Sequence, residues 1–280
     1  MKTIVITGCS TGFGRVTAFY IAERGWRVLA TVRQEAHQAE LLAEAHGKGL
    51  AESLIPVPCD ITRPEDVARL ALAVADVGSR LDALVNNAGT AFAGPLELLP
   101  LDDVRAQLEI NLFGHLAVTQ ALLPALKVAR GTIVNVSSIG GRVAIPLHGP
   151  YHMSKFALEA MSEVLRLELA HFGVRVVIIA PDASPTAIWD TALRRAHANP
   201  ALSNLGGYAP LAEAIERRAK HSAVSGFPPE LFARTVWRIV NSPRPAAIYF
   251  VPGSSGLVVA ARRLMPDWLW DVIVRRVLGW

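Results

Sequence analysis

The sequence predicts a doubly wound α/β domain, in which a parallel sheet of seven strands carries helices on both faces, followed by a helical tail. Two observations predict this fold. Short β-branched or apolar runs alternate with segments of helical periodicity along most of the 280 residues, and such alternation is typical of a parallel sheet with right-handed crossovers. The first run is followed directly by a glycine-rich turn and a helix. We expect residues 1–253 to form this single domain and residues 254–280 to form an amphipathic helical extension.

Each element is predicted from its local pattern. Runs rich in valine and isoleucine predict strands near residues 3–7, 26–32, 54–59, 82–86, 131–137, 174–180 and 246–251. Apolar residues at positions i, i+3 and i+4 predict helices over residues 64–77, 102–126 and 150–172. Ligands of such sheets bind beyond the carboxyl ends of the strands, so the residues that follow the strands are the candidate site residues.

The first strand, Thr-Ile-Val-Ile-Thr at residues 3–7, leads into the turn Gly-Cys-Ser-Thr-Gly-Phe-Gly at residues 8–14. Glycines let a backbone approach a phosphate closely, and the amide groups at the start of the following helix offer hydrogen-bond donors. The spacing Gly-x3-Gly-x-Gly differs from the Gly-x-Gly-x-x-Gly fingerprint of dinucleotide-binding turns. The turn alone is therefore compatible with a pyrophosphate site or with an ordinary tight turn.

Tyr151 and Lys155 stand four residues apart at the start of a helical pattern, with Ser138 upstream. Residues four apart share one face of a helix, so the lysine would lie one turn from the phenol. A nearby cation stabilises phenolate and lowers the phenol pKa from its reference value of about 10. This predicts that Tyr151 is a general acid/base. The pair alone is also compatible with a surface pair or with a tyrosine packed under a lysine stem.

Further segments join these two motifs. Over roughly residues 1–186 the chain resembles the short-chain dehydrogenase/reductase family, and it is most similar to the 17β-hydroxysteroid and retinol dehydrogenase branch. The family segments are Thr7-Gly8-x3-Gly12-x-Gly14, Asn86-Asn87-Ala88-Gly89, Asn111, Asn135-Val136-Ser137-Ser138 and Tyr151-x3-Lys155, and the branch segments are Gly8-Cys9-Ser10, Ala30-Thr31-Val32-Arg33 and Ser154-Lys155-Phe156-Ala157-Leu158-Glu159. The resemblance implies a Rossmann-type fold and an enzyme that interconverts an alcohol and its carbonyl compound.

The resemblance implies a catalytic role for Asn111, Ser138, Tyr151 and Lys155. Ser138 would hydrogen-bond the substrate oxygen, while Tyr151 would exchange a proton with it. Lys155 would lower the pKa of the tyrosine and hold the hydroxyls of the nicotinamide ribose. Asn111 would hold a water that relays protons to Lys155, although a polar residue on a helix face is the alternative. The neighbouring Ser137 is expected to face the other side.

The cofactor is expected to be NADP, with NAD as the alternative. An acid at the end of the second strand is usual for NAD, whereas an arginine there accommodates a 2′-phosphate, and this strand ends in Arg33 without an acid. Asp60 resembles the adenine-contacting acid of the family, or it caps the helix near Pro64. The expected cofactor-binding residues are Gly8, Ser10, Thr11, Gly12, Phe13, Gly14, Arg33, Asp60, Ile61, Asn87, Ala88, Gly89, Tyr151, Lys155, Pro181 and Thr186.

One segment departs from the family pattern. After the sixth strand the family usually has Pro-Gly-x3-Thr, whereas this chain has Pro-Asp-Ala-Ser-Pro-Thr at residues 181–186. Asp182 therefore adds a Cβ and a charge close to the expected nicotinamide end of the site. This departure puts the geometry of the loop in question.

The substrate is expected to be a bulky apolar alcohol or ketone of steroid, retinoid or terpenoid type. The long segment 186–228 spaces aromatic and leucine residues between polar ones, as a substrate lid would, although ordinary packing anchors give the same pattern. Ser138, His148, Tyr151 and Trp189 are the expected substrate-binding residues, and no metal-ligand spacing is present. A non-catalytic NADP(H)-binding redox sensor or scaffold is the alternative function.

Composition predicts a cytoplasmic enzyme. Two cysteines provide no disulfide framework in a chain of this length, and a net charge of +4 gives little support to nucleic-acid binding. We see no signal-peptide pattern at the N-terminus and no apolar run that approaches the roughly 18 residues of a membrane span.

The tail has the pattern of an amphipathic helix. Leu269, Trp270, Ile273, Val274 and Val277 recur at near-heptad spacing among charged residues. Tryptophans and arginines concentrated in the last residues suit a membrane interface. The alternatives are a helix pair packed on the body or across a dimer interface, and we expect a homodimer or homotetramer, with peripheral membrane contact as a further role of the tail.

Overall fold

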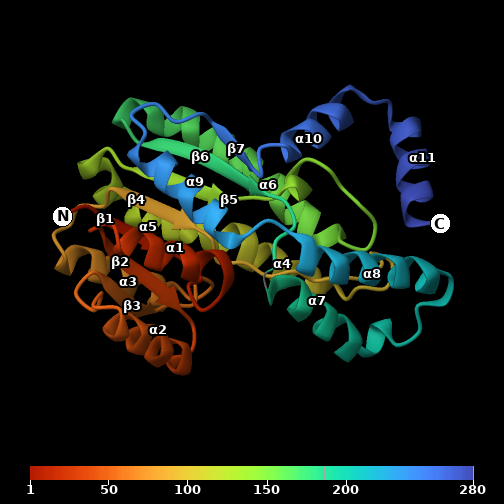
Figure 1. Cartoon of the computed structure of the whole chain (residues 1–280), viewed down its shortest axis with the longest axis horizontal. Coiled ribbons are helices and arrows are strands. Elements are labelled where there is room, and N and C mark those ends of the chain that lie inside the picture. Colours follow the sequence, from red (N-terminus) through yellow and green to blue (C-terminus); the bar gives the residue numbers. More distant parts are fainter. Residues whose placement is uncertain (186, 280) are drawn as a thin grey trace.

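The protein forms a sheet of seven parallel strands with helices on both faces (Figure 1). The structure is a computed structural model, and it describes residues 1–185 and 187–279. The strand order is β3-β2-β1-β4-β5-β6-β7. The order reverses between β1 and β4, and a ligand crevice is expected beyond the carboxyl ends of strands at such a point. The predicted fold class is confirmed.

The observed elements agree with the predicted ranges to within a few residues. The strands are β1 Thr3–Ile6, β2 Arg27–Val32, β3 Leu54–Pro58, β4 Ala83–Asn86, β5 Thr132–Val136, β6 Arg175–Pro181 and β7 Ile248–Val251. The α-helices are α1 Gly12–Ala22, α2 Glu35–Gly47, α3 Pro64–Asp76, α4 Leu101–Leu108, α5 Gly114–Ala129, α6 Gly149–Leu169, α7 Ala187–Ala198, α8 Ala209–Ser225, α9 Pro229–Asn241, α10 Ser255–Leu264 and α11 Asp267–Leu278.

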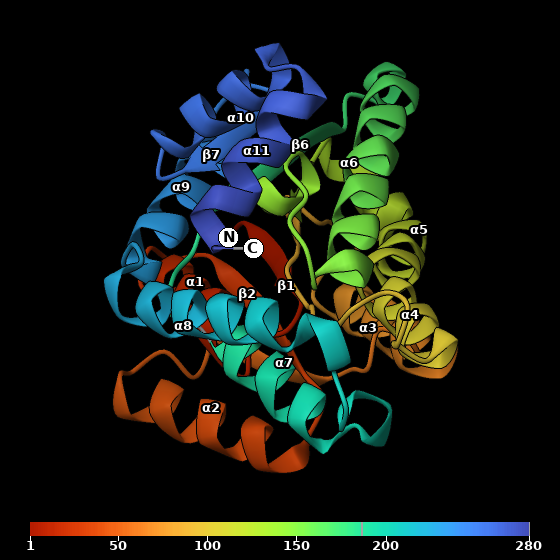
Figure 2. The ribbon, with the colours of Figure 1, turned by 90° about the vertical axis from the view of Figure 1, so that its right-hand side faces the viewer.

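Two apolar cores hold the helices on the two faces of the sheet, with α1 and α9 on one side and α5 and α6 on the other (Figure 2). Successive side chains of a strand point to opposite faces. In β1, accordingly, Ile4 and Ile6 pack with Phe232 of α9, whereas Val5 packs with Leu122 of α5. This burial on both faces explains why the strands are continuously apolar in sequence.

A chain of buried hydrogen bonds fixes α6 against the middle of the sheet. Asn86 in β4 donates to Oδ1 of Asn135 in β5 at 2.8 Å and to Oγ1 of Thr119 in α5 at 2.9 Å. Asn135 in turn donates to Oγ of Ser162 in α6 at 2.8 Å. All four side chains are buried, so each bond avoids the cost of an unpaired polar group in the core. The network thereby sets the position of α6, which carries the tyrosine and lysine.

The helix predicted over residues 102–126 is longer and less regular than expected. It consists of α4, a π-helical turn at Glu109–Phe113 and α5. The stretch Leu101–Ala129 is long and apolar enough to cross a membrane by length and composition alone, which qualifies our expectation from the sequence. Its inner face contributes Val118 and Leu122 to the core and buries Asn111. In this fold the stretch is therefore a helix that covers the sheet.

The tail contains two helices, α10 and α11, and the amphipathic pattern predicted from the sequence falls on α11. The break falls at Pro266, which precedes α11 and cannot donate a backbone hydrogen bond. Leu278 packs on Leu147, Leu211 and Ile215. The inner face of α11 thus contacts the body, as one of the alternatives predicted.

Candidate active site

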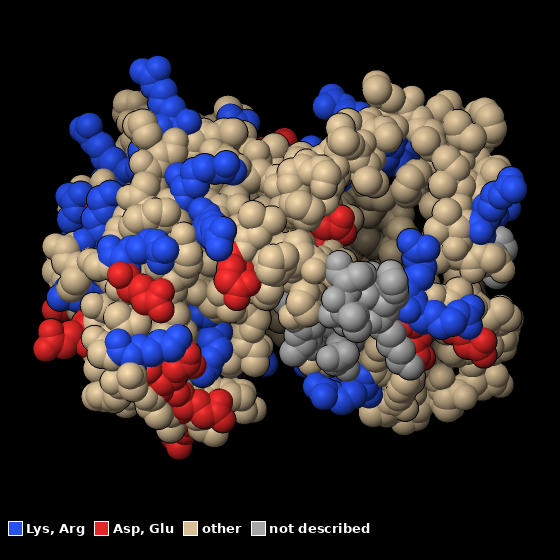
Figure 3. Space-filling model, in the orientation of Figure 1, with Lys and Arg blue, Asp and Glu red and all other residues tan. Residues whose placement is uncertain are grey.

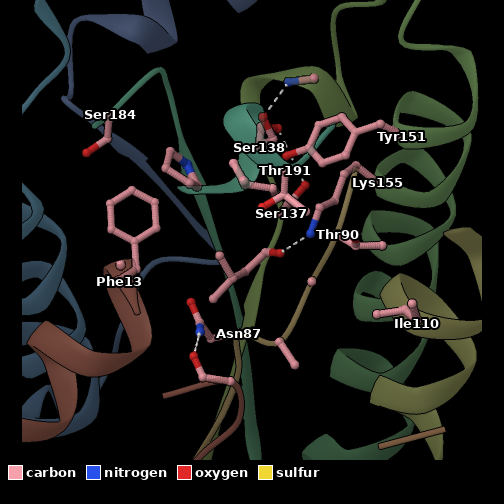
Figure 4. A pocket seen from close by; sticks show the side chains of 18 of the residues that line it. Phe13, Asn87, Thr90, Ile110, Ser137, Ser138, Tyr151, Lys155, Ser184 and Thr191 are labelled. Atoms are coloured by element: carbon pink, nitrogen blue, oxygen red, sulfur yellow. Dashed lines mark hydrogen bonds between the residues drawn. The ribbon is translucent and has the colours of Figure 1, made fainter. Parts of the chain in front are cut away.

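The predicted site residues lie around one large cavity at the carboxyl ends of the strands. The cavity has a volume of about 790 Å³. Tyr151, Ser138 and Lys155 lie together at one end of the close-up in Figure 4, and Phe13 and Asn87 lie at the other. The predicted residues that line the cavity are Gly8, Ser10, Thr11, Gly12, Phe13, Arg33, Asp60, Ile61, Asn87, Ala88, Gly89, Ser138, His148, Tyr151, Lys155 and Pro181.

Four predicted residues require separate mention. Gly14 and Asn111 are not among the residues that line the cavity. Thr186 lies outside the described residues, and the side chain of Trp189 is likewise not described. Their expected contacts with cofactor and substrate remain predictions.

The turn after β1 requires glycine at two places. Gly8 has φ of +72°, and a Cβ there would lie 2.7 Å from the Cα of Ala88. A Cβ on Gly14 would lie 2.3 Å from the carbonyl oxygen of Gly8. The glycines therefore allow the turn to pack tightly on the start of α1, whose free amide groups face the cavity end of the turn. This arrangement fits the pyrophosphate of a dinucleotide.

Two threonines that we did not single out hold this turn. Oγ1 of Thr7 accepts hydrogen bonds from the backbone of Asn87 and Ala88, both at 2.9 Å, and Oγ1 of Thr31 accepts one from Gly8 at 3.1 Å. The Asn87 amide group donates to the carbonyl groups of Thr7 and Gly8. The loops after β1, β2 and β4 are thus tied together. The signal in sequence was a threonine at or just after a strand end, which is too common to be specific.

Arg33 and Asp60 lie at the ends of β2 and β3, where both line the cavity. Oδ1 of Asp60 accepts hydrogen bonds from the backbone and side chain of Thr62 at 3.0 and 2.7 Å. Burial opposes ionisation, but these bonds and the charges of Arg33 and Arg63 lower the pKa of Asp60. The carboxylate therefore closes a turn, and it does not cap α3, whose N-cap residue is Arg63.

Ser138 and Tyr151 form a hydrogen-bonded pair between the end of β5 and the start of α6. Ser138 follows β5 and its Oγ also accepts a hydrogen bond from the backbone of Gly140 at 3.0 Å. Burial raises the pKa of Tyr151, and the hydrogen bond with Ser138 opposes that rise only in part. The expected lowering of this pKa is therefore wrong, because burial outweighs the stabilisation of phenolate.

Lys155 is buried one turn along α6 from Tyr151. Its ammonium nitrogen lies 5.7 Å from the centre of the Tyr151 ring and donates to the carbonyl oxygen of Val136 at 2.8 Å. Burial lowers the pKa of Lys155 to about 8, and the charge of Glu159 opposes this. The ammonium therefore remains the main form at neutral pH, and it lies on the cavity wall beside the phenol.

Glu159 is a buried residue that we did not predict. It accepts a hydrogen bond from Ser137 at 2.8 Å and pairs with Arg142 at 2.6 Å. Ser137 thus turns toward α6 and Glu159, whereas Ser138 pairs with the tyrosine, as we expected. Glu159 lies one turn beyond Lys155, so its charge favours the protonated lysine. The sequence showed only an acid within a helix, which is usually a surface residue.

Asn111 lies in the π-helical turn, behind the cavity wall. Its amide group donates to the carbonyl oxygen of Thr90 at 3.0 Å and to Oγ of Ser154 at 3.2 Å, and its oxygen accepts from the backbone of Thr90 at 3.0 Å. The described contacts thus bind the loop after β4 to α6. The water relay to Lys155 stays a prediction.

Three neutral histidines surround the site. Burial lowers the pKa of His148 to about 4 and that of His115 to about 3. Burial also lowers the pKa of His152, which donates to the Gly140 carbonyl at 2.7 Å and accepts from the backbone of Ile145 at 3.1 Å. The neutral ring of His152 thus stabilises the loop between β5 and α6 through its hydrogen bonds to Gly140 and Ile145. Of the three, His148 and His152 also line the cavity.

Helix α7 covers the tyrosine. Ala192 is buried against Tyr151 and Ala91, and Ile188 packs on the same cluster. Arg195 hydrogen-bonds Oγ1 of Thr90. Thr191 of this helix lines the same cavity as Ser138 and is labelled in Figure 4. This helix therefore limits access to the reacting end of the cavity.

The tail also takes part in the site, which the sequence did not indicate. Val258 of α10 and Trp270 and Leu278 of α11 line the cavity. Asp182, the departure from the family pattern, accepts a hydrogen bond from Ser255 at the start of α10 at 2.7 Å. A residue beside the expected nicotinamide end is thereby bonded to the tail.

Comparisons with known proteins identify the family of this chain. The family model described as short chain dehydrogenase matches residues 2–196. The chain is 34% identical to the uncharacterized oxidoreductase YusZ of Bacillus subtilis over 281 aligned residues, which cover 99% of this chain and 98% of that protein. It is 42% identical to human retinol dehydrogenase 5 over 183 residues, covering 64% of this chain but only 55% of the human protein.

Solved structures share the fold. A short-chain dehydrogenase from Streptomyces avermitilis superposes with a TM-score of 0.74 at 26% identity and covers 97% of both chains. A short-chain dehydrogenase/reductase from Burkholderia phymatum, in complex with NAD, has a TM-score of 0.81 at 24% identity, over 94% of this chain and 92% of that one. At 24% identity, the similarity to the Burkholderia phymatum structure supports a shared fold and nothing further.

The pKa of Lys155 predicts a pH dependence of stability. Because the folded-state pKa of about 8 lies below the model value of 10.5, the unfolded chain binds more protons between these two values, and the free energy of unfolding rises with pH there. Relative to Lys155→Met, the wild type should gain about 2 kcal/mol between pH 8 and 10. Urea denaturation across this range measures the difference.

The exposed Lys2 provides the control, because Lys2→Met should leave the slope of the wild type unchanged. The subtraction removes the contributions of the buried thiols and of Tyr151, which titrate in the same range in the unfolded chain. If Lys155→Met has the same slope of unfolding free energy against pH as the wild type, the pKa of Lys155 is not lowered by burial.

Proposed function

Because this chain belongs to the short-chain dehydrogenase family, we propose that it interconverts an alcohol and its carbonyl compound with NADP(H) as the cofactor. The observation that carries the proposal is the arrangement of Ser138, Tyr151 and Lys155 on one wall of the cavity. Hydroxyl, phenol and ammonium lie side by side there, buried from bulk water. Proton exchange with a substrate oxygen requires such a set.

The residues act on the substrate oxygen. Ser138 and Tyr151, which already share a hydrogen bond, hold that oxygen between their hydroxyl groups, and Tyr151 gives or takes the proton. The bound nicotinamide supplies or accepts the hydride at the neighbouring carbon. Lys155 holds its charge beside the phenol, while its bond to the Val136 carbonyl orients it. These fixed dipoles are in place before the reaction, so little reorganisation is needed.

Arg33 supports NADP over NAD. It lines the cavity at the end of β2, and its charge acts on Asp60. A guanidinium group there binds a 2′-phosphate, for which its planar donors are well suited. NAD is the alternative cofactor, and a non-catalytic sensor is the alternative function.

The substrate is proposed to be bulky and largely apolar. The apolar residues that line the cavity include Val143, Ile145, Ile188, Ile215 and Trp270. Residues 186–228 act as a lid, since α7 already packs on Tyr151, and residues 254–280 form an extension that completes the wall. Retinoid, steroid and terpenoid alcohols fit this chemistry.

The outer face of the tail is proposed to contact lipid peripherally, with the enzyme otherwise cytoplasmic and homo-oligomeric. Leu264 is 86% exposed and Trp268 is 68% exposed. Arg262 and Arg263 end α10 beside them. Exposed apolar side chains among arginines suit the surface of an anionic bilayer.

Removing the phenol hydroxyl tests catalysis. In Tyr151→Phe, turnover should fall by a factor of about 10² to 10⁴, the usual effect of losing a general acid/base, while NADPH binding by fluorescence titration should persist. Tyr20→Phe, on α1, is the matched control. Undiminished turnover would refute the mechanism, and NADPH binding without any turnover in the wild type would favour the sensor.

Removing Arg33 tests the cofactor. Since a hydrogen bond to a charged group contributes roughly 1.5–3 kcal/mol, Arg33→Ala should raise the Kd of NADPH by about tenfold to a hundredfold and leave that of NADH nearly unchanged. Calorimetric titration measures both constants, with Arg24→Ala as a surface control. Equal losses for the two cofactors would show that Arg33 does not contact the phosphate.

Charging the exposed apolar residues tests the tail. Vesicles that contain phosphatidylserine should sediment the wild type, and Leu264→Glu combined with Trp268→Glu should weaken that binding by at least about tenfold, since each buried apolar side chain contributes roughly 1.5–3 kcal/mol. Val128→Glu with Leu167→Glu, at exposed positions on other helices, is the control.

Light scattering of the same variants separates lipid contact from assembly. A change of mass in solution without vesicle binding by the wild type would assign this face to an interface between copies. If neither mass nor vesicle binding responds to the tail variant, both roles of the outer face are wrong.

A further inference from the structure

The wall of the cavity farthest in sequence from the catalytic residues is built from α8 and the tail. Ile215 and Arg218 of α8, and Trp270 and Leu278 of α11, line it. Leu278 is buried against Ile215, which holds the end of α11 on α8. The apolar side chains and the arginine of this wall thus border the same cavity as Tyr151.

A second, smaller cavity of about 460 Å³ adjoins this wall and shares Arg218 and Leu278 with it. Arg217, Arg218 and Arg276 all line the smaller cavity, and no acidic residue is among its lining residues in the described part of the chain. Figure 3 shows Lys and Arg side chains near the hollow between the body and the tail. Like charges held in one small space repel each other, and a bound anion relieves that repulsion.

The nearby acids are already engaged. Glu213 pairs with Arg217 at 3.7 Å, and Glu216 pairs with His197 at 3.6 Å. Asp267, at the start of α11, pairs with Arg262. Among the described residues, Arg218 and Arg276 have no carboxylate within 4.0 Å. Within the described part of the chain, no carboxylate therefore pairs with either of these two guanidinium groups.

We propose that Arg218 and Arg276 bind the anionic end of an amphipathic substrate, a long-chain hydroxy or oxo acid whose reacting carbon lies at Tyr151. The proposal rests on the proposed function of the site and narrows its substrate class. A guanidinium group donates two parallel hydrogen bonds to a carboxylate, which fixes the direction in which the chain enters. The apolar wall between the two ends buries the hydrocarbon.

A neutral steroid or retinoid makes no use of these arginines. It would fill the apolar part of the cavity and leave both cations solvated at its end. A site that binds a carboxylate differs in this respect from a site with apolar contacts alone. The affinity of the enzyme for its substrate should therefore depend on the charge of the substrate as well as on its length.

The test compares oxidation of ω-hydroxydodecanoate and of its methyl ester by the enzyme with NADP. The wild type should have a lower KM for the acid than for the ester. Arg218→Ala and Arg276→Ala should each reduce the ratio of the ester KM to the acid KM by up to about fivefold, as expected for a partly exposed ion pair. The ratio should also fall toward one at 1 M salt, where the screening length is about 3 Å.

Arg234→Ala is the matched control, because Arg234 is exposed on α9 and lines neither cavity. It should keep the wild-type ratio, and Arg218→Lys should keep part of it. Circular dichroism of each variant verifies folding. Equal KM values for acid and ester in the wild type, or a ratio that both alanine variants leave intact, would overturn the proposal.

A binding measurement separates failure of this inference from failure of the proposed function. Calorimetric titration of dodecanoate and of dodecanol into the enzyme with NADP needs no turnover. Preferential binding of dodecanoate that is lost in Arg218→Ala supports the anion site even if neither alcohol is oxidised, which would refute only the proposed reaction. Turnover of neutral alcohols with no preference for dodecanoate would refute only the anion site.

Discussion

The buried ammonium group of Lys155 is the constraint on which the arrangement of the site depends. A cation inside a protein is costly unless polar partners surround it. Here the Val136 carbonyl accepts its hydrogen bond, which is possible because β5 ends at that residue and α6 begins where the lysine can reach it. Glu159, one turn further, favours the charge. The same geometry places Tyr151 at the end of the strand, next to Ser138. The position of the phenol therefore follows from the hydrogen bond between Lys155 and the Val136 carbonyl.

Much of the fold and the reacting centre could be predicted because their signals are local. Valine-rich runs predicted the strands, and the four-residue spacing predicted that Tyr151 and Lys155 share one face of α6. A doubly wound sheet then brings strand ends together, so residues as distant in sequence as Arg33 and Ser138 were expected at one edge. The roles of Glu159 and Thr7 were missed because each depends on a partner far away in sequence. The contribution of the tail to the cavity was missed for the same reason, since periodicity shows which face of a helix is apolar but not what that face contacts.

The expected pKa of Tyr151 illustrates how competing effects are decided by burial. The sequence indicated a cation nearby, and the structure places that cation 5.7 Å from the ring centre. The same packing that brings the lysine close also removes water from both groups, with Ala192 of α7 lying over the phenol. Desolvation disfavours the charged form of each partner. Proximity of opposite charge therefore predicts the direction of a pKa shift only when the degree of burial is known as well.

The hydrogen bond between Asp182 and Ser255 makes the tail part of the domain's own architecture. The family usually places a glycine at the position of Asp182, which has no side chain to bond a helix. In this chain the aspartate joins the loop after β6 to the first turn of α10, so a hydrogen bond holds together two segments that are 73 residues apart in sequence. Residue 182 and the tail are therefore expected to be inherited together. In a chimera, a tail without a serine at the position of Ser255 would leave Asp182 without its hydroxyl partner beside the expected cofactor site.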